Sequence, residues 1–591
     1  MCGILGQVVL TNRVDENSFQ RMLNTLEHRG PDGQGIWISD NQRVAFGHRR
    51  LSFFDLTENG KQPMHSNDGY LHLTYNGEIY NFQALKKELE AEYSFHSNCD
   101  SEVILAAYRQ WGISCISKFE GMFSFALFDE QLNELFLVRD RFGIKPLYYA
   151  HQNNQFLFAS ELKAIVECAD VEKRLNYGAM MDFFVYRYIP SPKTIWQDMY
   201  KVPPAHYLKV NLSDFSTSLV EYWTIQVGDE SVGKEAFAEA YKLELKKSVD
   251  AHVLADVPIG SFLSGGYDSS TLAIMGKDID QAHEWQTFTV GFENWEKSED
   301  QFAELLCQQH QIENKKVSLN KTSLDDLDLM PNVYDEPIAD ISIIPTYAVS
   351  KLARQYRKAV LSGEGADELF LGYHWQKEWI MESSISWKFW QTKKKLVPFY
   401  SQAMSMGNFD RLELKQLFQP NLHDYIPENV HWFYDAHAKE HWPKEKAIQY
   451  LDMKCFMGEL VLTKIDRASM ANSLEVRVPF LTHQAFEKVF QHRKSDYFDL
   501  EKPKYPIYSF LKNSVSMDLL ARKKQGFVGP DDYYMDVSFY KEALKNSYLI
   551  SDGIISREYI DQQLSETYNW RLWKIVVFEK WYAHWRKYIS K

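Results

Sequence analysis

Two short apolar segments, each followed at once by a glycine-rich turn, constrain the fold of this chain most. Segment 259–263 precedes the turn 264–269 (SGGYDS), and segment 358–361 precedes 362–368 (SGEGADE). A helical pattern follows the first turn, and helical stretches alternate with apolar strands beyond Ser231. This alternation predicts a parallel sheet with crossover helices. In such a sheet the two turns can face one crevice at the strand ends.

The residues of these turns suit a nucleotide. Glycine-rich turns before a helix present free N–H groups to phosphate, and carboxylates such as Asp268 and Asp367 can hold Mg²⁺ with pyrophosphate. Glu364 could orient or activate an acceptor. No lysine follows the glycines, so the first turn is not a Walker A loop. The alternatives are an ordinary strand-to-helix turn and, for Glu364 and Glu368, a solvated helix start; two such turns in one chain favour the nucleotide site.

The first part of the chain, to about residue 210, has a different pattern. It contains short β-like runs and two helical patterns, which predict layered sheets with packed helices. The runs are 70–80, 121–129, 135–141, 146–150 and 155–160, and the helical patterns are 16–28 and 83–93. Segment 195–223 indicates more strand and turn, and the chain beyond about 380 is mostly helical. We therefore predict a boundary between about 210 and 230, with domains 2–215 and 230–591.

Cys2 follows Met1 and precedes the small residue Gly3. If the methionine is removed, the thiol and the α-amine belong to one residue. An α-amine has a pKa of about 8, so it can accept the thiol proton. This is the arrangement of an amino-terminal nucleophile. Taken alone, Cys2 is better explained as a buried structural cysteine.

Downstream residues match the groups of a glutamine substrate. Arg50 suits an α-carboxylate, which a guanidinium binds in a bidentate manner, and Asp100 suits an α-ammonium. The Asn76 side chain and the Gly77 backbone N–H suit the oxyanion formed when sulfur attacks an amide. Asn-Gly is also the strongest hairpin dipeptide, and both interpretations can hold together.

Bulk properties exclude several classes. A net charge of −14 argues against a nucleic-acid partner, because phosphate contacts need clustered lysine and arginine. The start lacks the charged stretch of a secretory signal, and no apolar segment is long enough to span a bilayer. Six cysteines without a CxxC pair disfavour a zinc site and a disulfide framework. We expect a cytoplasmic protein.

Ordered motifs along the chain carry a family resemblance. MCGILG, HRGPDG, RLS, YNGEIYN, GMFSFALFD and RDRFGIKPLYY resemble the class II glutamine amidotransferase domain. SGGYDSS resembles the PP-loop of ATP pyrophosphatases, and DEPIADISIIPTY, SGEGADELFLGY, LTKIDRASMANSLEVRVPFL and RKKQGFVGP are similar to asparagine synthetase. The chain is identified, from Cys2 to about Pro530, as a member of the glutamine-hydrolysing asparagine synthetase family.

The resemblance implies a fold and a set of site residues. It implies an αββα Ntn-hydrolase sandwich, followed by a parallel-sheet PP-loop domain with a helical carboxyl-terminal part. The expected catalytic residues are Cys2, Asn76, Gly77 and Glu364. Glutamine is expected at Arg50, Leu51, Ser52, Asn76, Gly77, Glu78 and Asp100. ATP is expected at Leu263, Ser264, Gly265, Gly266, Asp268, Ser269, Val290, Ser362 and Gly363, and Mg²⁺ at Asp268 and Asp367.

Three features outside the turns are open to two interpretations. Lys464 and Arg467 could neutralise charge on the α-phosphate of ATP, or could belong to an ion-paired helix face. Segment 475–480 indicates a structural ion pair and a core strand. The tryptophans of the carboxyl-terminal part could form a core or meet a partner, and their near-helical spacing favours a core; they are Trp570, Trp573, Trp581 and Trp585.

The implied reaction has two halves. Cys2 forms a γ-glutamyl thioester and releases ammonia, which passes through an interdomain tunnel; ATP converts a carboxylate into an acyl-AMP, which ammonia attacks. Aspartate is the leading acceptor, and a homodimer is a candidate assembly. The alternatives are a uronic acid of a surface polysaccharide or a natural-product precursor as acceptor, a pure glutaminase, and a non-catalytic glutamine- or nucleotide-binding regulator. β-Lactam and lasso-peptide cyclases need no ammonia, and the intact glutamine set argues against them.

Three details depart from the usual pattern of the family. Tyr267 stands where a small aliphatic residue is common, and Thr482 stands where aspartate usually follows Pro-Phe-Leu. Lys315 and Lys316 occupy a segment that often carries histidine. These departures bear on the acceptor rather than on the chemistry.

Overall fold

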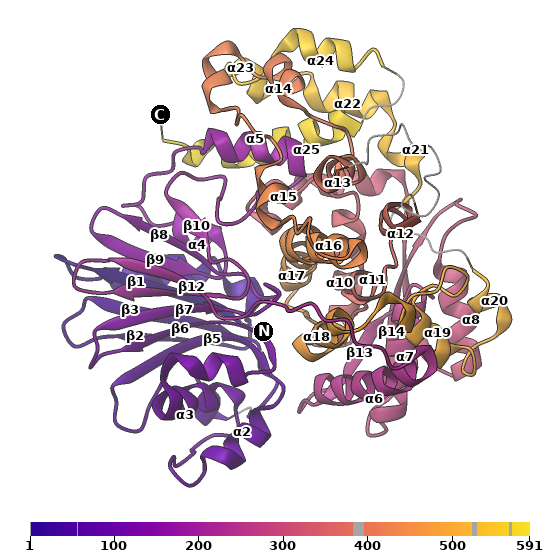
Figure 1. Ribbon diagram of the computed structural model, residues 1–591. Helices are drawn as coiled ribbons and strands as arrows, with labels where there is room; N and C mark the ends of the chain where they lie inside the picture. Colours follow the sequence, from indigo (N-terminus) through magenta and orange to yellow (C-terminus); the bar gives the residue numbers. More distant parts are fainter. Residues whose placement is uncertain (1, 56, 382–394, 523–528, 567–569, 591) are drawn as a thin grey trace.

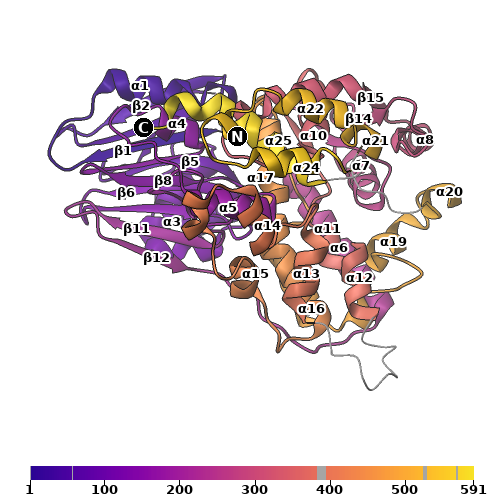
Figure 2. The same cartoon turned by 90° about the horizontal axis from the view of Figure 1, so that it is seen from above.

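The computed structural model describes residues 2–55, 57–381, 395–522, 529–566 and 570–590. Figure 1 shows a β-sandwich formed by the amino-terminal part of the chain beside a sheet wrapped in helices formed by the rest. Figure 2, seen from above, shows the same two bodies side by side.

Two antiparallel six-stranded sheets form the sandwich, in the orders β10-β8-β9-β1-β3-β2 and β12-β11-β7-β6-β5-β4. Apolar side chains from both sheets, such as Ile4, Phe46, Phe128 and Phe158, meet between them. The strands of the first sheet are β1 (Gly3–Val9), β2 (Gly33–Ile38), β3 (Val44–Arg50), β8 (Tyr148–Gln152), β9 (Gln155–Ala159) and β10 (Met199–Lys201). Those of the second are β4 (Met64–His65), β5 (Leu71–Ile79), β6 (Gly121–Asp129), β7 (Glu134–Arg139), β11 (His206–Asn211) and β12 (Thr217–Glu221).

Helices cover both outer faces of the sandwich. Helices α1 (Glu16–Asn24) and α4 (Leu162–Val166) contact the first sheet, and α2 (Phe82–Leu89) and α3 (Asp100–Trp111) cover the second. This is the αββα layering of Ntn hydrolases, and it confirms the predicted fold class. Helix α3 was not predicted. Its residues 100–108 are all buried, so the segment lacks the polar face that reveals a helix in sequence.

A five-stranded parallel sheet forms the centre of the second body, in the order β15-β14-β13-β16-β17. The first strand in sequence lies in the middle, so the order reverses between β13 and β16. The strands are β13 (Ile259–Phe262), β14 (Gln286–Phe292), β15 (Glu313–Leu319), β16 (Ala359–Leu361) and β17 (Glu475–Arg477). Crossovers between them include α7 (Tyr267–Ile279), α8 (Asp300–His310), α10 (Ile343–Arg354) and α17 (Leu462–Met470). The parallel sheet confirms the prediction made from the two turns.

The remaining helices surround this sheet. A π-helical stretch, 452–461, joins α16 (Lys444–Leu451) to α17. The others are α5 (Tyr177–Tyr186), α6 (Lys234–Val253), α9 (Met330–Tyr334), α11 (Ala366–Phe370), α12 (His374–Met381), α13 (Leu396–Met404), α14 (Arg411–Leu417), α15 (Trp432–His437), α18 (His483–Gln491), α19 (Tyr505–Leu511), α20 (Met517–Leu520), α21 (Asp531–Tyr534), α22 (Val537–Leu544), α23 (Tyr548–Ser551), α24 (Arg557–Gln563) and α25 (Trp570–Trp585). In the described part of the chain, no helix has both the length and the apolar character needed to cross a bilayer.

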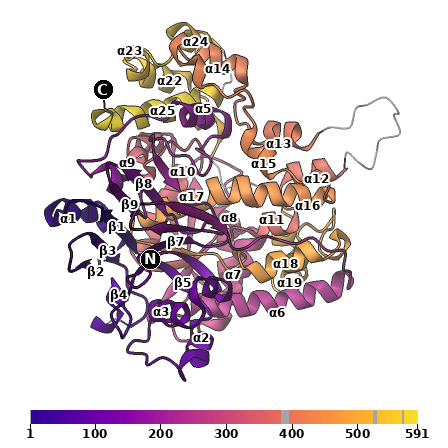
Figure 3. The same cartoon turned by 60° about the vertical axis from the view of Figure 1, so that its left-hand side comes forward.

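Helix α25 answers the question about the tryptophans. Trp573, Trp581 and Trp585 are buried, and the Trp581 ring lies 5.8 Å from that of Trp196, which follows α5. Figures 1 and 3 show α25 beside α5. These tryptophans therefore form a core that joins the end of the chain to residues 177–196.

Candidate active sites and the interface between them

The amino-terminal site is built around Cys2, which is buried just before β1. Its backbone N–H donates to Asn76 Oδ1 at 2.9 Å. Asn76 lies on strand β5, between β6 and the edge strand β4, and its Nδ2 is buried without a hydrogen-bond partner in the structure. A buried unpaired donor is costly, so its persistence indicates a place where a ligand oxygen can bind.

Gly77 follows Asn76 at a point of close packing. A Cβ atom at this position would lie 2.2 Å from the backbone oxygen of Met122 on β6. Only glycine therefore fits here without displacing the neighbouring strand. Asn76 and Gly77, which were predicted together, lie side by side at the end of β5.

Arg50 and Asp100 approach the pocket from two other elements. The Arg50 guanidinium donates to the backbone oxygens of Asp55 and Thr57, at 2.6 and 3.2 Å, so it supports the loop after Ser52. Asp100, the first residue of α3, accepts hydrogen bonds from the Tyr75 hydroxyl at 2.6 Å and the Ile79 N–H at 2.9 Å. Burial raises the pKa of Asp100 to about 6 against these hydrogen bonds.

Burial dominates the electrostatics of Cys2. It raises the pKa of the thiol, although a backbone hydrogen bond from Leu51 and the charge of Arg50 act in the opposite direction. The resting form at neutral pH is therefore the thiol. A nucleophile of this kind needs a base beside it, as predicted for the α-amine of a mature amino terminus.

The two glycine-rich turns meet where the strand order of the parallel sheet reverses. The first lies between β13 and α7, where Ser264 N–H donates to Ser269 Oγ at 3.2 Å. The second lies between β16 and α11. A Cβ atom on Gly363 would lie 2.9 Å from Asp268 Cβ, so the two turns are in contact. The structure thus brings together the residues predicted for ATP on both turns, with Leu263 buried just after β13 and Val290 buried on β14.

Lys504, at the start of α19, bridges the two carboxylates that were predicted for Mg²⁺. Its Nζ lies 2.6 Å from Asp367 Oδ1 and also contacts Asp268 Oδ2. Burial alone would lower the pKa of Lys504, and the two carboxylates raise it instead. Two carboxylates that converge on one cation fit Mg²⁺, which is usually held by one or two carboxylates plus phosphates. Among the described residues, no cluster of three or more metal-binding side chains occurs. Sequence reasoning missed Lys504, because a lone lysine before Tyr-Pro carries no local signal.

Glu364 and Lys464 lie near these turns. Glu364 is partly buried, the loss of solvent around its carboxyl raises its pKa, and its buried Oε2 makes no hydrogen bond in the structure. Lys464 Nζ donates to Ser342 Oγ at 2.6 Å and faces Asp340 at 3.8 Å. The charge of Lys464 lowers the pKa of Glu364, which places the two within electrostatic reach of each other.

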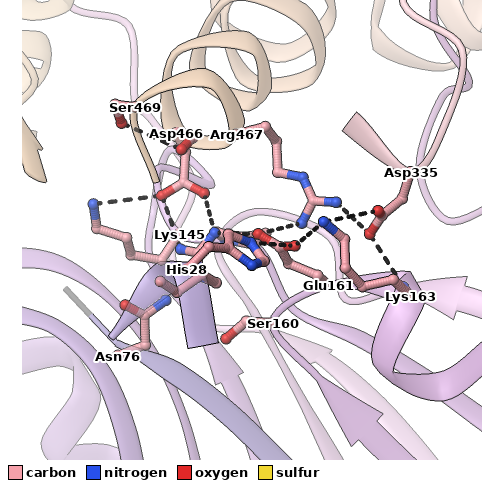
Figure 4. Close-up of polar contacts among 12 residues, drawn as sticks. His28, Asn76, Lys145, Ser160, Glu161, Lys163, Asp335, Asp466, Arg467 and Ser469 are labelled. Atoms are coloured by element: carbon pink, nitrogen blue, oxygen red, sulfur yellow. Dashed lines mark hydrogen bonds and ion pairs between the residues drawn. The ribbon is translucent and has the colours of Figure 1, made fainter. Parts of the chain in front are cut away.

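Arg467 lies at the interface between the two bodies rather than on a turn (Figure 4). It is fully buried, with Nη1 3.0 Å from Glu161 of the sandwich and Nη2 paired with Asp335. Arg29 of the sandwich likewise pairs with one carboxylate of each body. It pairs with Glu161 of the sandwich at 2.8 Å and with Asp466 of α17 at 2.9 Å. Lys145, Lys163 and His28 complete this cluster (Figure 4). The contacts of Arg467 therefore match the interpretation that it belongs to an ion-paired helix face.

Each of the positions that depart from the family pattern makes local contacts in the structure. The Tyr267 hydroxyl donates to the backbone oxygen of Leu520 at 2.6 Å, so this side chain points toward α20. Thr482 Oγ1 accepts from Ala485 N–H at 3.2 Å and caps α18, a task that aspartate also performs. Lys315 and Lys316 lie on the edge strand β15 and pair with nearby carboxylates.

Comparison with known proteins agrees with this geometry. Residues 1–223 match the glutamine amidotransferase domain family, and residues 240–583 match the asparagine synthase family. Asparagine synthetase (glutamine-hydrolyzing) 1 of Bacillus subtilis is 31% identical, over 99% of this chain and 96% of that protein. A putative asparagine synthetase of Methanocaldococcus jannaschii is 34% identical over 63% of this chain and 76% of its own length. A putative asparagine synthetase of Mycobacterium bovis is 28% identical over 96% and 93% of the two chains.

Fold, site geometry and these matches together define a glutamine-dependent amidotransferase with a PP-loop synthetase domain. More specifically, the chain belongs to the asparagine synthase family. It is an enzyme of the glutamine-hydrolysing asparagine synthetase class. The family uses ATP.

Proposed function

We propose that this enzyme transfers the amide nitrogen of glutamine to aspartate at the expense of ATP. The products are asparagine, glutamate, AMP and pyrophosphate, and β-aspartyl-AMP is the activated intermediate. Family membership and the names of the relatives support aspartate as the acceptor.

One contact carries the proposal that the two half-reactions are coupled. Arg29 Nε donates to the backbone oxygen of Cys2 at 3.1 Å, and its guanidinium also pairs with Asp466 of the synthetase domain. The predicted nucleophile therefore lies at the interface that faces the other domain. Ammonia released there can stay away from bulk water, which would protonate it.

In the glutaminase half, Cys2 Sγ attacks the side-chain amide of glutamine. The α-amine of the mature chain takes the thiol proton and passes it to the departing ammonia, leaving a γ-glutamyl thioester. The unpaired Nδ2 of Asn76 and the Gly77 N–H supply donors for the oxyanion. Arg50, Leu51, Ser52, Glu78 and Asp100 bind the rest of glutamine in this proposal, and water then releases glutamate.

In the synthetase half, the aspartate side-chain carboxylate attacks the α-phosphate of ATP and pyrophosphate leaves. The turns 264–269 and 362–368 bind ATP, and Glu364, whose pKa is raised by desolvation, orients the acceptor. Asp268 and Asp367 would hold Mg²⁺, which neutralises charge on pyrophosphate. Lys504 and Lys464 lie close enough to add positive charge, whereas Arg467 would act through the interface. Ammonia then displaces AMP.

A Cys2→Ala variant tests the separation of the two sites. It should release no glutamate from glutamine, yet it should form the amide from added ammonium at a rate close to that of the wild type. Cys115→Ala, a change at another buried cysteine in the same domain, is the matched control. Loss of both activities in a folded Cys2→Ala protein would contradict the proposal.

An acceptor screen tests the substrate. The enzyme is given glutamine, ATP and one carboxylic acid at a time, and pyrophosphate and the amide are followed by mass spectrometry. Aspartate should give asparagine. If aspartate is inert and a uronic acid or another acid turns over, the acceptor is wrong and the chemistry stands.

The place of action and the assembly state are further parts of the proposal. We propose a cytoplasmic enzyme, which agrees with six buried, unpaired cysteines, and a homodimer as the assembly to test. Analytical ultracentrifugation at micromolar concentration would decide between monomer and dimer.

A further inference from the structure

Strand β17 belongs to the ATP-binding sheet through its main chain. It pairs with β16 in parallel register, with Leu361 opposite Arg477. Ser362, the residue after β16, begins the second glycine-rich turn, and its N–H donates to the backbone oxygen of Arg477 at 2.8 Å. The main chain of Arg477 therefore positions the start of this turn.

The side chains of the same strand face the other domain. Arg477 and Glu475 are fully buried and joined, with Arg477 Nε 2.5 Å from Glu475 Oε1. Arg477 Nη2 lies 3.4 Å from Glu78 Oε1 on the sandwich strand β5. Glu78 follows Asn76 and Gly77 and is one of the residues proposed to bind glutamine.

The Arg477 guanidinium is held in place from several sides. Nη1 donates to the backbone oxygens of His252 and Leu254 at the end of α6, at 2.7 and 2.9 Å. The guanidinium also lies over the Phe53 ring of the sandwich, 5.2 Å from its centre. These contacts leave only Nη2 directed at the glutamine pocket. In the structure Nη2 makes no hydrogen bond, and its contact with Glu78 is an ion pair.

A second contact joins the same elements. The ring of His252, whose carbonyl accepts a hydrogen bond from Arg477, packs against the ring of Tyr80, with 3.8 Å between the ring centres and a tilt of 30°. Tyr80 comes two residues after Glu78. The charge of Glu475 also reaches the Cys2 thiol, the Asp100 carboxyl and Glu78, and it raises the pKa of each. Glu475, on strand β17 of the synthetase domain, therefore contributes to the electrostatics of the glutamine pocket.

We propose that Arg477 is a positioning residue of the glutamine site that is supplied by the ATP-binding domain. Its Nη2 orients the Glu78 carboxylate toward glutamine, and its main chain holds the turn that begins at Ser362. ATP bound at that turn therefore alters the affinity for glutamine, and by linkage glutamine alters the affinity for ATP by the same factor. This inference rests on the proposed function, because it takes Glu78 to be a glutamine ligand.

The test compares Arg477→Met with Arg477→Lys in the full-length enzyme. In Arg477→Met we expect the KM for glutamine to rise roughly 10- to 100-fold, the range for a buried charged group such as Glu78 that is left without its partner. Ammonium-dependent pyrophosphate release should stay within about twofold of wild type. Arg477→Lys keeps the positive charge but not the planar set of guanidinium donors, so its glutamine KM should lie between those of wild type and Arg477→Met. Arg493→Met, which removes an exposed pair with Asp229, is the control and should change neither value.

A second readout addresses the link to ATP. The KM for glutamine hydrolysis is measured with and without ATP and aspartate. We expect the two values to differ in wild type and to become equal in Arg477→Met. An unchanged glutamine KM in folded Arg477→Met overturns the positioning role. If the ratio of the glutamine KM with and without ATP and aspartate is the same in Arg477→Met as in wild type, the coupling between the ATP and glutamine sites is overturned.

If Arg477→Met fails to fold, Glu78→Gln decides the question, because it removes the same ion pair from the sandwich side. Glu78→Gln should raise the glutamine KM and leave ammonium-dependent pyrophosphate release intact; an unchanged KM overturns the inference. A wild-type enzyme that makes no amide from glutamine would instead contradict the proposed function.

Discussion

Asn76 shows how one side chain can serve two purposes at the residue scale. Its Oδ1 accepts the backbone N–H of Cys2, and its Nδ2 stays unpaired in a buried position. The pairing of Asn76 with Cys2 was predictable from residue types, because an oxyanion needs fixed donors. Lys504 was not predictable, since its role depends on two carboxylates that lie more than a hundred residues away in the chain.

Replacement of Asn76 by alanine removes the unpaired donor. We expect glutamate release from glutamine to fall by about 10²- to 10³-fold, as for loss of one oxyanion-hole donor. Ammonium-dependent amide formation should not change. Asn12→Ala, at an exposed turn of the same domain, is the control. Equal losses with both nitrogen sources would show that Asn76 supports the fold instead.

Lys446 gives a pH-dependent prediction. Burial lowers the pKa of its ammonium to about 7, from an ordinary value of 10.5. The unfolded chain therefore binds this proton more tightly than the folded one, and the resulting loss of stability is full below pH 7 and fades as the pH rises to 10.5.

Replacement of Lys446 by methionine removes this dependence. The change in thermal midpoint, mutant minus wild type, should be more favourable at pH 6 than at pH 9 in differential scanning calorimetry. Its hydrogen bonds to Val489 O and the Tyr497 hydroxyl are lost at both pH values, so they do not affect the comparison. Lys545→Met, at an exposed lysine, should show no such trend.

At the scale of elements, prediction succeeded where a segment has one buried face or a distinctive turn. The strand β6 (Gly121–Asp129) coincides with the predicted run 121–129. Prediction failed for α3 and α5, whose residues are buried nearly all round, because no polar face alternates with the apolar one. One interpretation placed Glu368 at a solvated helix start, but Glu368 is buried at the start of α11.

Glu161, which immediately precedes α4, contributes to the interface through three cationic side chains and one histidine. Its carboxylate pairs with Arg29, Arg467, Lys163 and His28 at 2.8 to 3.0 Å. Glu161→Gln would leave buried positive charges without their partner, which costs about 3–5 kcal/mol.

We expect a lower denaturation midpoint for Glu161→Gln and less amide formed per glutamate released. Glu172→Gln, at an exposed pair with Arg174, should change stability by about 0.5 kcal/mol or less. A Glu161→Gln protein as stable as the Glu172 control would contradict a structural role for the cluster.

At the scale of the whole molecule, the two active sites were visible in the sequence but their junction was not. Arg29 and Asp466 are 437 positions apart, and no local pattern relates them. Aromatic contacts cross the same junction, with Phe142 4.8 Å from Phe486 and Trp196 5.8 Å from Trp581 between ring centres. One continuous apolar core includes residues of both bodies.

Separation of the two bodies should expose this apolar surface. Residues 1–223 expressed alone are therefore expected to aggregate, because large exposed apolar patches promote association. Co-expression with residues 224–591 should restore a complex with the elution volume of the intact chain in size-exclusion chromatography. A monodisperse fragment 1–223 that melts like the full-length protein would contradict this expectation.

The charge cluster around Glu161 has a consequence for protein engineering. Each body contributes an arginine that pairs with a carboxylate of the other as well as with one of its own: Arg29 pairs with Asp466, and Arg467 pairs with Glu161. A chimaera that grafts a foreign glutaminase onto this synthetase would inherit unmatched ions at its seam unless both halves of each pair were carried over together. A foreign glutaminase joined to this synthetase therefore needs an arginine at the position of Arg29 and a glutamate at the position of Glu161.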